Sequence, residues 1–396
     1  MSRSTANGPR LRPRVALLIE TSNAYARGLL HGIVAYIREH EHWSFYLLEQ
    51  GRGALPPNWL SQWKGDGIIA RIESRHIART VVNLGIPMVD VSAGRHVASI
   101  PWVETDDTAI ADLALEHFLE RGFEHFAYCG DDRFNWSRWR EESFARQVEA
   151  MGYACHVLSP NGQRSDRQIA EIEQWLKALP KPLAVLACYD IRGQQILDAC
   201  RNAELAVPDE VAVLGVDNDE LLCELASPRL SSVVPDSRRT GYEAATLLAK
   251  IMKGERPAVT EIRIAPLGIE KRQSTDALAI DDPTVVEAVR FIREHACEAI
   301  HVPDVLRTIP LSRKVLEKRF RERLGHTVRE EIMRVRIDRV KRLLVDTDLA
   351  LAEIAVRAGF EHPEYLSVVF KRETGNTPGE FRRTHVPNRY TMRSRQ

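Results

Sequence analysis

Residues 355–381 read AVRAGFEHPEYLSVVFKRETGNTPGEF and predict two helices joined by a tight turn. Apolar residues recur at helical spacing up to Gly359, a residue type that commonly ends helices, and Pro363 is suited to the first turn of the next helix. In that second helix Leu366 and Phe370 fall on one face and are expected to be buried. The other face is left to contact a partner, which is the arrangement of a helix-turn-helix.

The same pattern occurs once more, 50 residues earlier in the chain. Such a repeat marks a duplicated supersecondary unit. Residues 327–346, between the copies, predict a helix about 30 Å long, close to the roughly 34 Å of one turn of B-DNA. One chain is therefore expected to place two recognition helices in successive major grooves. The repeated identities are Arg307 and Arg357, Leu316 and Leu366, Phe320 and Phe370, Gly325 and Gly375, and Thr327 and Thr377.

The outer faces of the two recognition helices supply the candidate DNA contacts. Arg and Lys donate to guanine, Glu accepts from cytosine, and a methyl-bearing side chain such as Val368 contacts thymine. The alternative is a helical bundle with a solvated charged face. The candidates are Arg313, Lys314, Glu317, Lys318 and Arg321 in the first copy and Glu364, Ser367, Val368, Lys371 and Arg372 in the second, and Arg319, Arg323, Arg382 and Arg383 are expected to join Lys371 and Arg372 in contacting phosphates.

Charge is distributed unevenly along the chain. The 396 residues include 55 Lys and Arg and 55 Asp and Glu, but basic residues prevail from Pro283 onward and acidic residues before it. This favours a polyanionic partner for the C-terminal part. The six cysteines show no disulfide or zinc spacing, so no metal or cofactor is expected and the cysteines are interpreted as buried thiols. No apolar run reaches the length of a membrane span and no secretory signal is recognisable, which predicts a cytoplasmic protein without membrane contact.

Residues 15–274 alternate short apolar runs with amphipathic stretches, as βαβ units around parallel sheets do. The length favours two lobes over one sheet. The predicted fold is a two-lobed α/β domain followed by an all-α domain with two helix-turn-helix motifs. The predicted boundaries are 12–276 for the sugar-sensing domain, 277–283 for the linker and 284–386 for the DNA-binding domain.

Ligands of open α/β sheets bind at the carboxyl ends of the strands, so residues after the apolar runs are the candidate ligand contacts. They include TSNAYAR at 21–27, DDRFNWSRWREESF at 131–144, Tyr189 with Asp190, and DNDE at 217–220. Carboxylates, an arginine and aromatic rings together suit a sugar. The alternative for Asp190 and Asp217 is that each caps the next helix.

The sequence at 355–383 resembles the signature of the AraC family of transcription regulators. The matching residues are Ala355, Gly359, Phe360, Tyr365, Phe370, Lys371, Gly375, Thr377, Pro378, Phe381 and Arg382. Two positions depart from it. Leu366 stands where an aromatic residue is common, and the first copy has RTIPLS at 307–312 in place of a turn with Gly.

The organisation of residues 15–275 resembles the periplasmic-binding-protein fold of LacI-type repressors. This resemblance implies that Arg140 and Asp217 bind a sugar, that Asp190 occupies a strand-end binding position with Tyr189 in place of the usual Asn, and that Tyr25 contacts the sugar. LacI-type proteins carry an N-terminal helix-turn-helix, whereas here the DNA-binding part is expected at the other end.

A LacI-like body joined to an AraC-type tail resembles regulators of xylose operons, for example in AVRFIREHAC at 288–297 and RKVLEKRF at 313–320. The resemblance implies a D-xylose-dependent activator that forms homodimers and works with double-stranded DNA and RNA polymerase. The alternative is a cytosolic sensor of another pentose or small ligand that acts as a repressor or through a protein partner. The common nucleotide-binding and hydrolase motifs are missing, so an enzyme is not expected.

Overall fold

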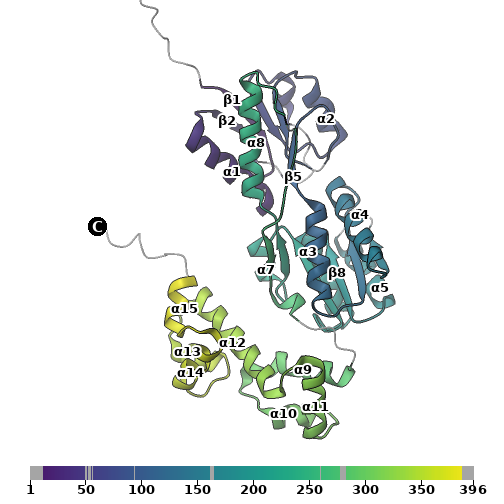
Figure 1. Ribbon diagram of the computed structural model, residues 1–396, viewed down its shortest axis with the longest axis vertical. Helices are drawn as coiled ribbons and strands as arrows, with labels where there is room; N and C mark the ends of the chain where they lie inside the picture. The colour runs from purple at the N-terminus through teal and green to yellow at the C-terminus, as the bar shows by residue number, and fades with distance from the viewer. Residues whose placement is uncertain are drawn as a thin grey trace, which may run out of the picture. The chain divides into compact units, whose positions relative to one another are not determined.

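The computed structural model describes residues 12–385 except 50, 52–54, 56, 93, 161–164, 259 and 277–281. It divides into two compact units, Met1–Ala279 and Ile280–Gln396, which are called here the sensor unit and the helical unit (Figure 1). The fold class predicted from the sequence is confirmed. The predicted linker, 277–283, lies for the most part outside the described residues, so the domain boundaries stay a prediction.

The sensor unit contains two six-stranded sheets, each the centre of one lobe. Every described strand pair is parallel except that of β10 with β12, so both sheets have their ligand-binding edge at the carboxyl ends of the strands. In sheet order, the first lobe has β11 (Glu261–Ile264), β5 (Trp102–Thr105), β4 (Met88–Asp90), β3 (Gly67–Ala70), β1 (Arg14–Leu18) and β2 (Ser44–Leu47), with α1 (Ala24–His40), η1 (Asn58–Gln62), α2 (Arg75–Val82) and α8 (Ser237–Met252). The second lobe has β12 (Gly268–Glu270), β10 (Ser231–Val234), β9 (Val211–Val216), β8 (Leu183–Ala187), β6 (His125–Cys129) and β7 (Cys155–Leu158), with α3 (Asp107–Leu119), α4 (Asn135–Ala150), α5 (Ser165–Ala178), α6 (Asp190–Asn202), α7 (Glu220–Leu225) and η2 (Gln273–Thr275).

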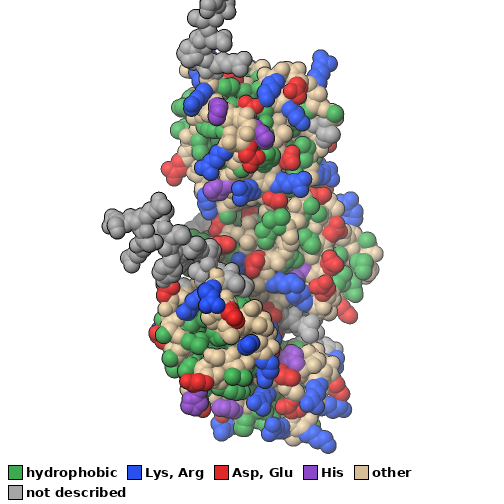
Figure 2. Space-filling model, turned by 60° about the vertical axis from the view of Figure 1, so that its left-hand side comes forward, with side chains coloured by type: hydrophobic (Ala, Val, Ile, Leu, Met, Phe, Trp, Pro, Cys, Tyr) green, Lys and Arg blue, Asp and Glu red, His purple; other side chains and the backbone are tan. Residues whose placement is uncertain are grey.

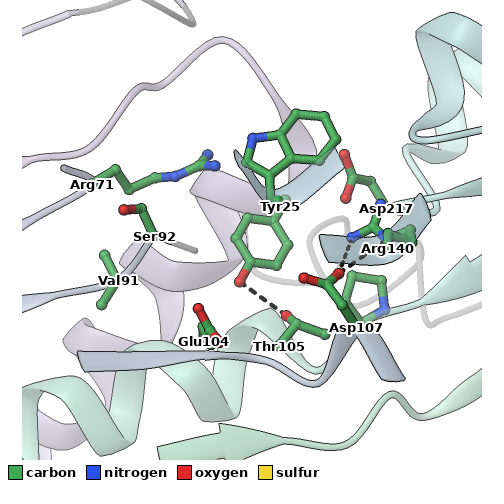
Figure 3. A pocket seen from close by; sticks show the side chains of 11 residues that line it. Tyr25, Arg71, Val91, Ser92, Glu104, Thr105, Asp107, Arg140 and Asp217 are labelled. Carbon is green, nitrogen blue, oxygen red and sulfur yellow. Dashed lines mark hydrogen bonds and ion pairs between the residues drawn. The ribbon is translucent and has the colours of Figure 1, made fainter. Parts of the chain in front are cut away.

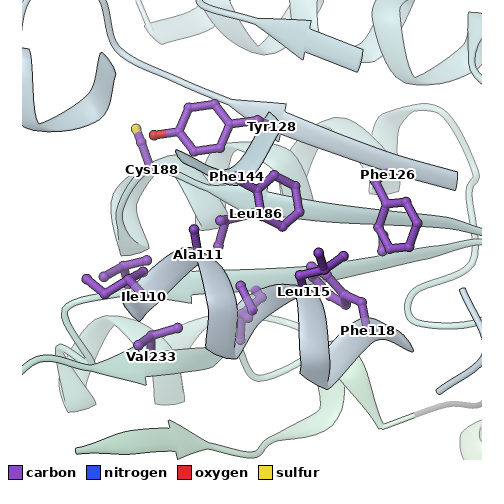
Figure 4. Packing of buried hydrophobic residues seen from close by; sticks show 14 of the residues in the cluster. Ile110, Ala111, Leu115, Phe118, Phe126, Tyr128, Phe144, Leu186, Cys188 and Val233 are labelled. Carbon is purple, nitrogen blue, oxygen red and sulfur yellow. The ribbon is translucent and has the colours of Figure 1, made fainter. Parts of the chain in front are cut away.

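The central strands of the second lobe are buried on both faces, as continuous apolar runs such as LAVLA predict. One face packs against α3 and α4 through Phe118, Phe126 and Phe144 (Figure 4). Tyr128 lies in the same cluster, and its hydroxyl donates to the backbone carbonyl of Ser137 at 2.8 Å, so its polar end is satisfied inside the core. This rigid core fixes the strand ends that line the site.

Helices α1 and α8 of the first lobe pack so closely that glycines are required between them. A Cβ atom on Gly32 would lie 1.8 Å from the backbone oxygen of Arg238, and one on Gly241 would lie 2.0 Å from that of Leu29. Any side chain at these positions would push the helices apart. The contact holds α1, and with it Tyr25, in the first lobe.

The chain crosses between the lobes three times, at Asp106, at 235–236 and at 265–267. At the first two crossings an aspartate caps the helix that follows. Asp106 accepts from the backbone amides of Thr108 and Ala109, and Asp236 accepts from that of Arg239 at 2.9 Å. Each cap satisfies amides that a helix start leaves open, so it fixes where the next lobe begins.

The helical unit contains the predicted duplication, and α12 joins its two copies. The amino-terminal part of α12 packs into the first core, with Leu316 and Phe320, and the remainder packs into the second core, with Leu366 and Phe370. The described elements are α9 (Pro283–His295), η3 (Ala296–Glu298), α10 (Val302–Thr308), α11 (Arg313–Leu324), α12 (Val328–Asp346), α13 (Leu351–Arg357), α14 (Pro363–Thr374) and α15 (Pro378–His385).

Candidate functional site

The sensor unit holds a cavity at the carboxyl ends of its parallel strands. About 460 Å³ of empty space lies among its lining residues, part of it open to solvent. Both lobes contribute to its lining (Figure 3). The lining residues are Tyr25, Arg71, Val91, Ser92, Glu104, Thr105, Asp107, Trp136, Arg140, Asp217 and Pro235.

A buried ion pair links Arg140 of α4 to Asp107 at the start of α3. Atoms Nε and Nη2 of Arg140 lie 3.0 and 2.9 Å from Oδ1 of Asp107, and Nη1 donates to the carbonyl of Cys188. Burial alone would lower the pKa of Arg140, but the charge of Asp107 and its other neighbours raise it above the ordinary value. The guanidinium therefore stays charged, and its direction is set before a ligand arrives.

Tyr25 and Arg71 line the cavity from the first lobe. The guanidinium of Arg71 lies 5.3 Å from the ring centroid of Tyr25 and pairs with Glu20 and Glu73. The Tyr25 hydroxyl lies 3.0 Å from Oγ1 of Thr105. Burial raises the pKa of Tyr25, so the phenol is neutral and offers both a donor and an acceptor.

Oε2 of Glu104 and Nε of Arg71 are buried polar atoms of lining residues, and they lack a hydrogen-bond partner within the described part of the chain. The other oxygen of Glu104 pairs with Arg95, so this carboxylate is held in place. An unsatisfied buried acceptor and an unsatisfied buried donor among the lining residues of one cavity favour a ligand that can both donate and accept hydrogen bonds, as hydroxyl groups do.

Trp136 supplies an aromatic face to the cavity. Its ring stacks on Phe134, with centroids 5.2 Å apart, and meets Tyr189 edge-on at 5.7 Å. The guanidinium of Arg140 lies 5.6 Å from the Trp136 ring. An aromatic face next to charged hydrogen-bonding groups can cover the C–H side of a sugar while its hydroxyls are bound.

Asp217 enters the cavity from a strained turn after β9. Its φ is 107° and that of Asn218 is 46°, conformations that residues with a Cβ atom seldom adopt. The turn is held because the amide of Asn218 donates to Oγ of Ser232 at 3.0 Å and the amide of Asp219 donates to Asp190 at 2.7 Å. Such strain is typical of residues whose side chain must point to a ligand.

Asp190 does not line the cavity. Its side chain lies under the turn, where it accepts from Ser232 at 2.6 Å and from the amide of Asp219. Burial, followed by the nearby charge of Asp217, raises its pKa to about 8. A ligand-binding role for Asp190 therefore stays a prediction, and the structure shows it supporting the turn that carries Asp217.

Of the four sugar-contact candidates, Tyr25, Arg140 and Asp217 are brought together at one cavity. Sequence reasoning missed Arg71 and Asp107 as lining residues. Both follow strands of the first lobe, β3 and β5, so the rule that selects strand ends would have found them. The rule was not applied to Asp107 because β5 was not recognised as a strand, whereas the run GIIAR at 67–71 was recognised but Arg71 at its end was not chosen as a candidate.

The described ranges contain no group of three or more His, Cys, Asp or Glu side chains that could hold a metal ion. None of the helices in these ranges combines the length and the apolar composition of a membrane span. The six cysteines are free. Four are buried, as predicted for all of them, whereas Cys155 and Cys297 are half-buried.

The helical unit presents its two recognition helices much as the sequence predicts. In α14, Leu366, Val369 and Phe370 are buried, whereas Val368 is 68% exposed. Turn residue Gly359 has a φ of 75°, and Pro363 opens α14 as predicted. Arg313, Lys314, Lys318, Arg321, Glu364, Lys371 and Arg372 are exposed, and Glu317 and Ser367 are half-buried.

Basic side chains lie on the surface of the helical unit, in the lower part of the view in Figure 2. Two arginines expected to contact phosphates make contacts within the unit, and their phosphate contacts stay a prediction. Arg319 pairs with Asp282 at 3.1 Å, and Arg382 donates to the carbonyls of Leu344 and Leu349. Carbonyls near a helix end have no partner in the helix, which explains the second contact.

Three family models match the chain. They describe a XylR N-terminal domain over residues 14–108, a periplasmic-binding-protein-like domain over 115–275 and a helix-turn-helix domain over 306–384. The three matches lie in the two units described above.

The chain is similar to curated regulators over almost its whole length. It is 31% identical to the xylose operon regulatory protein of Escherichia coli K12 over 94% of this chain and 97% of that protein. It is 32% identical to the protein of the same name from Haemophilus influenzae, over 93% of this chain and 98% of that protein.

The chain is also similar to solved structures of transcription regulators. The structure of a xylose-binding transcription activator superposes with a TM-score of 0.82 at 30% identity, covering 96% of this chain and all of that one. A transcriptional regulator bound to cellobiose matches 66% of this chain and 84% of its own, with a TM-score of 0.56 at 21% identity, and that likeness shows the fold alone.

Proposed function

This chain belongs to the family of xylose operon regulatory proteins, and from that membership we propose that it is a transcription activator that binds D-xylose in the sensor unit and operator DNA through the helical unit. It acts in the cytoplasm, as a homodimer, and recruits RNA polymerase. The proposed sugar contacts are Tyr25, Arg140 and Asp217, joined by Arg71 and Asp107.

The cavity carries the sugar part of the proposal. Its lining combines fixed charges, a neutral phenol, an aromatic face and two unsatisfied buried polar atoms. Hydroxyl groups of a pentose would satisfy Glu104 and Arg71, and the Trp136 ring would cover its C–H side. A purely apolar ligand would leave these groups unpaired, at a cost of about 1–3 kcal/mol each.

Effector binding is proposed to act by stabilising the closed arrangement of the lobes. Contacts between the lobes already exist beside the cavity, with Asn135 donating to the carbonyl of Gly94 at 2.9 Å and Arg27 3.8 Å from Asp219. A sugar held by Tyr25 and Arg71 from one lobe and by Arg140 from the other adds to these contacts. It favours closure only to the extent that it binds the closed state more tightly.

Calorimetric titration of the full chain with D-xylose, beside L-arabinose, D-ribose and D-glucose, tests the effector. We expect selective binding of D-xylose, lost in Asp217→Ala and Arg140→Met and kept in Arg138→Met. Arg138 is an exposed residue of the same helix outside the lining, so it controls for the loss of charge. Binding of another sugar would replace the xylose assignment, and binding of none of the four would overturn the sugar proposal.

The proposed DNA binding is tested with a duplex that the wild-type chain selects from a random-sequence pool. Replacing Lys314 or Lys371 by Ala is expected to weaken binding and to reduce the slope of log affinity against log salt by about 0.9, the share of one phosphate contact. Lys177→Ala, which changes an exposed residue of α5 in the sensor unit, is the control. Unchanged slopes would remove these lysines from the DNA interface.

A further inference from the structure

We infer that Arg336 is a positioning residue that fixes the two recognition helices relative to each other, so that their spacing on DNA is built into the chain. The inference rests on the DNA-binding function proposed above and deepens it. Arg336 lies in the middle of α12 and is 7% exposed. Neither outer recognition face contains it, so a DNA contact does not account for its position.

The guanidinium of Arg336 binds the amino-terminal part of the helical unit, which packs around the first copy of the repeat. Its Nε donates to the carbonyl of Ala296 at 2.8 Å, and its Nη2 donates to the carbonyl of Ile300 at 2.7 Å. These carbonyls belong to the segment that connects α9 to α10. Two charge-assisted bonds from one planar group hold that segment in one orientation against α12.

The same side chain reaches the second copy. Its guanidinium lies 5.9 Å from the ring centroid of Phe360, in the turn that precedes α14. The neighbouring Gly359 packs so closely on the first copy that a Cβ atom there would lie 2.7 Å from the carbonyl oxygen of Ala296. Arg336 and Gly359 therefore converge on Ala296, one from α12 and one from the second turn.

The contacts of Arg336 and Gly359 with Ala296 form a junction between the two hydrophobic cores of the helical unit. The first core consists of residues from α9, α10, α11 and the start of α12, and the second of residues from the rest of α12 with α13 and α14. These separate cores would leave the copies joined mainly by α12. Bending or twisting at its centre would then change the distance between α11 and α14. A fixed junction prevents this, and Arg336 supplies its hydrogen bonds.

The first test measures geometry without DNA. Lys318 and Arg372, exposed on α11 and α14, are replaced in the full chain by a ketone-bearing amino acid for spin labelling, which leaves the six cysteines unlabelled. We expect a single narrow distance distribution, and a broad one in Arg336→Met. Arg329→Met, an exposed residue of the same helix, should stay narrow. An equally narrow distribution in Arg336→Met would overturn the inference.

The second test measures spacing on DNA, which a merely destabilising substitution would not change selectively. The probe is the duplex selected by the wild-type chain, with two base pairs inserted between the two footprinted regions, a rotation of about 70°. The wild-type chain should lose about tenfold or more in affinity. Arg336→Met should bind the parent duplex less tightly and lose much less on insertion.

The outcomes separate the inference from the function beneath it. Spacing discrimination in Arg336→Met equal to that of the wild type would overturn the inference while leaving DNA binding intact. If the wild-type chain selects no duplex from the pool, the proposed DNA binding fails, and the distance distribution still decides whether Arg336 fixes the helices. Circular dichroism and melting of each variant confirm that the helical unit is folded.

Discussion

The side chain of Asp217 lines the cavity, whereas its backbone has a positive φ, a conformation that favours glycine. Strain of this kind costs about 1–3 kcal/mol. We therefore predict that Asp217→Gly has a higher free energy of unfolding than Asp217→Ala by on the order of 1 kcal/mol. Both variants should lose sugar affinity, because both lack the carboxylate. Urea denaturation beside calorimetry measures the two effects.

The comparison of Gly with Ala isolates the backbone, because neither residue restores a side-chain contact. Equal stability of the two variants would show that the turn relaxes without cost. Sugar binding retained in either variant would show that the carboxylate of Asp217 is not a contact.

Asp190 leads to a prediction about pH. Burial and the charge of Asp217 raise its pKa to about 8, against about 4 in an unfolded chain. Between these values the folded chain binds more protons than the unfolded one, so the contribution of Asp190 to the free energy of unfolding falls as the pH rises from about 4 to about 8. Asp190→Asn removes this contribution. Its stability relative to the wild type should therefore increase with pH across that window and level off above it.

Urea titrations at several pH values within this window measure the difference. Asp198→Asn, on the exposed side of the same helix, is the matched control for the exchange of a carboxylate for an amide. A constant difference between Asp190→Asn and the wild type would mean that Asp190 does not titrate as the buried group described here.

The residues of the site show how much of it can be predicted from the sequence. The strand-end rule leads to the neighbourhoods of Tyr25, Arg140 and Asp217, because the carboxyl ends of parallel strands meet at one edge. It cannot tell whether a side chain there points to the ligand or away from it. Asp190 starts α6 and turns under the neighbouring loop, whereas Asp217 points into the cavity. This difference depends on packing between β9 and β10, which no local pattern encodes.

Among the secondary-structure elements, the repeated helices end in the same way. Gly325 and Gly375 follow α11 and α14 with φ values of 73° and 76°. Thr327 and Thr377 then start α12 and α15, each with its hydroxyl and amide bonded to a Glu three residues on. Each copy therefore closes with the same left-handed glycine and the same capping pair.

We predict that Gly375→Ala destabilises the end of α14 by about 1 kcal/mol, because Ala is strained at this φ. Gly379, four residues on, lies within α15 with nothing within 4 Å of an added Cβ atom. Gly379→Ala should stabilise α15 by up to about 1 kcal/mol. Hydrogen exchange of the α14 and α15 amides in the full chain measures both effects. Equal effects of the two substitutions would contradict this account.

Elements with strong local signals were predicted and are confirmed. The break at Gly359, the start at Pro363 and the long helix between the copies all appear. Strands β1 to β4 and β6 to β9 form from apolar runs of the body, but β5, β10, β11 and β12 were not foreseen. A short strand is recognisable where the run is apolar throughout, as GIIA of β3 is, whereas SSVV and WVET mix polar with apolar residues and give no continuous apolar run.

At the scale of the whole molecule, sugar and DNA binding should be coupled. If D-xylose raises the affinity for DNA by some factor, DNA must raise the affinity for D-xylose by the same factor, commonly about 5–150-fold. We predict this equality for the wild-type chain. Arg140→Met removes a group that lines the cavity. Its affinity for DNA should be the same with and without the sugar, and equal to the affinity of the wild-type chain without sugar.

Fluorescence anisotropy on the selected duplex and calorimetry with the sugar measure the two factors. Arg138→Met should keep the wild-type coupling. A wild-type chain with no coupling in either direction would show that the sensor unit does not regulate the helical unit through this ligand.

The close packing of α1 on α8 has a consequence for how the protein is made. The two helices lie roughly 200 residues apart in the chain, so at about 5–20 residues per second α1 leaves the ribosome some 10–40 s before α8 exists. Until then the face around Gly32 is uncovered and β5 lacks its neighbour β11. The central strands and helices of the second lobe are synthesised without interruption in between. The first lobe therefore begins first but receives α8 and β11 only after most of the second lobe has been made, and its early segments stay open to chaperones and proteases until then.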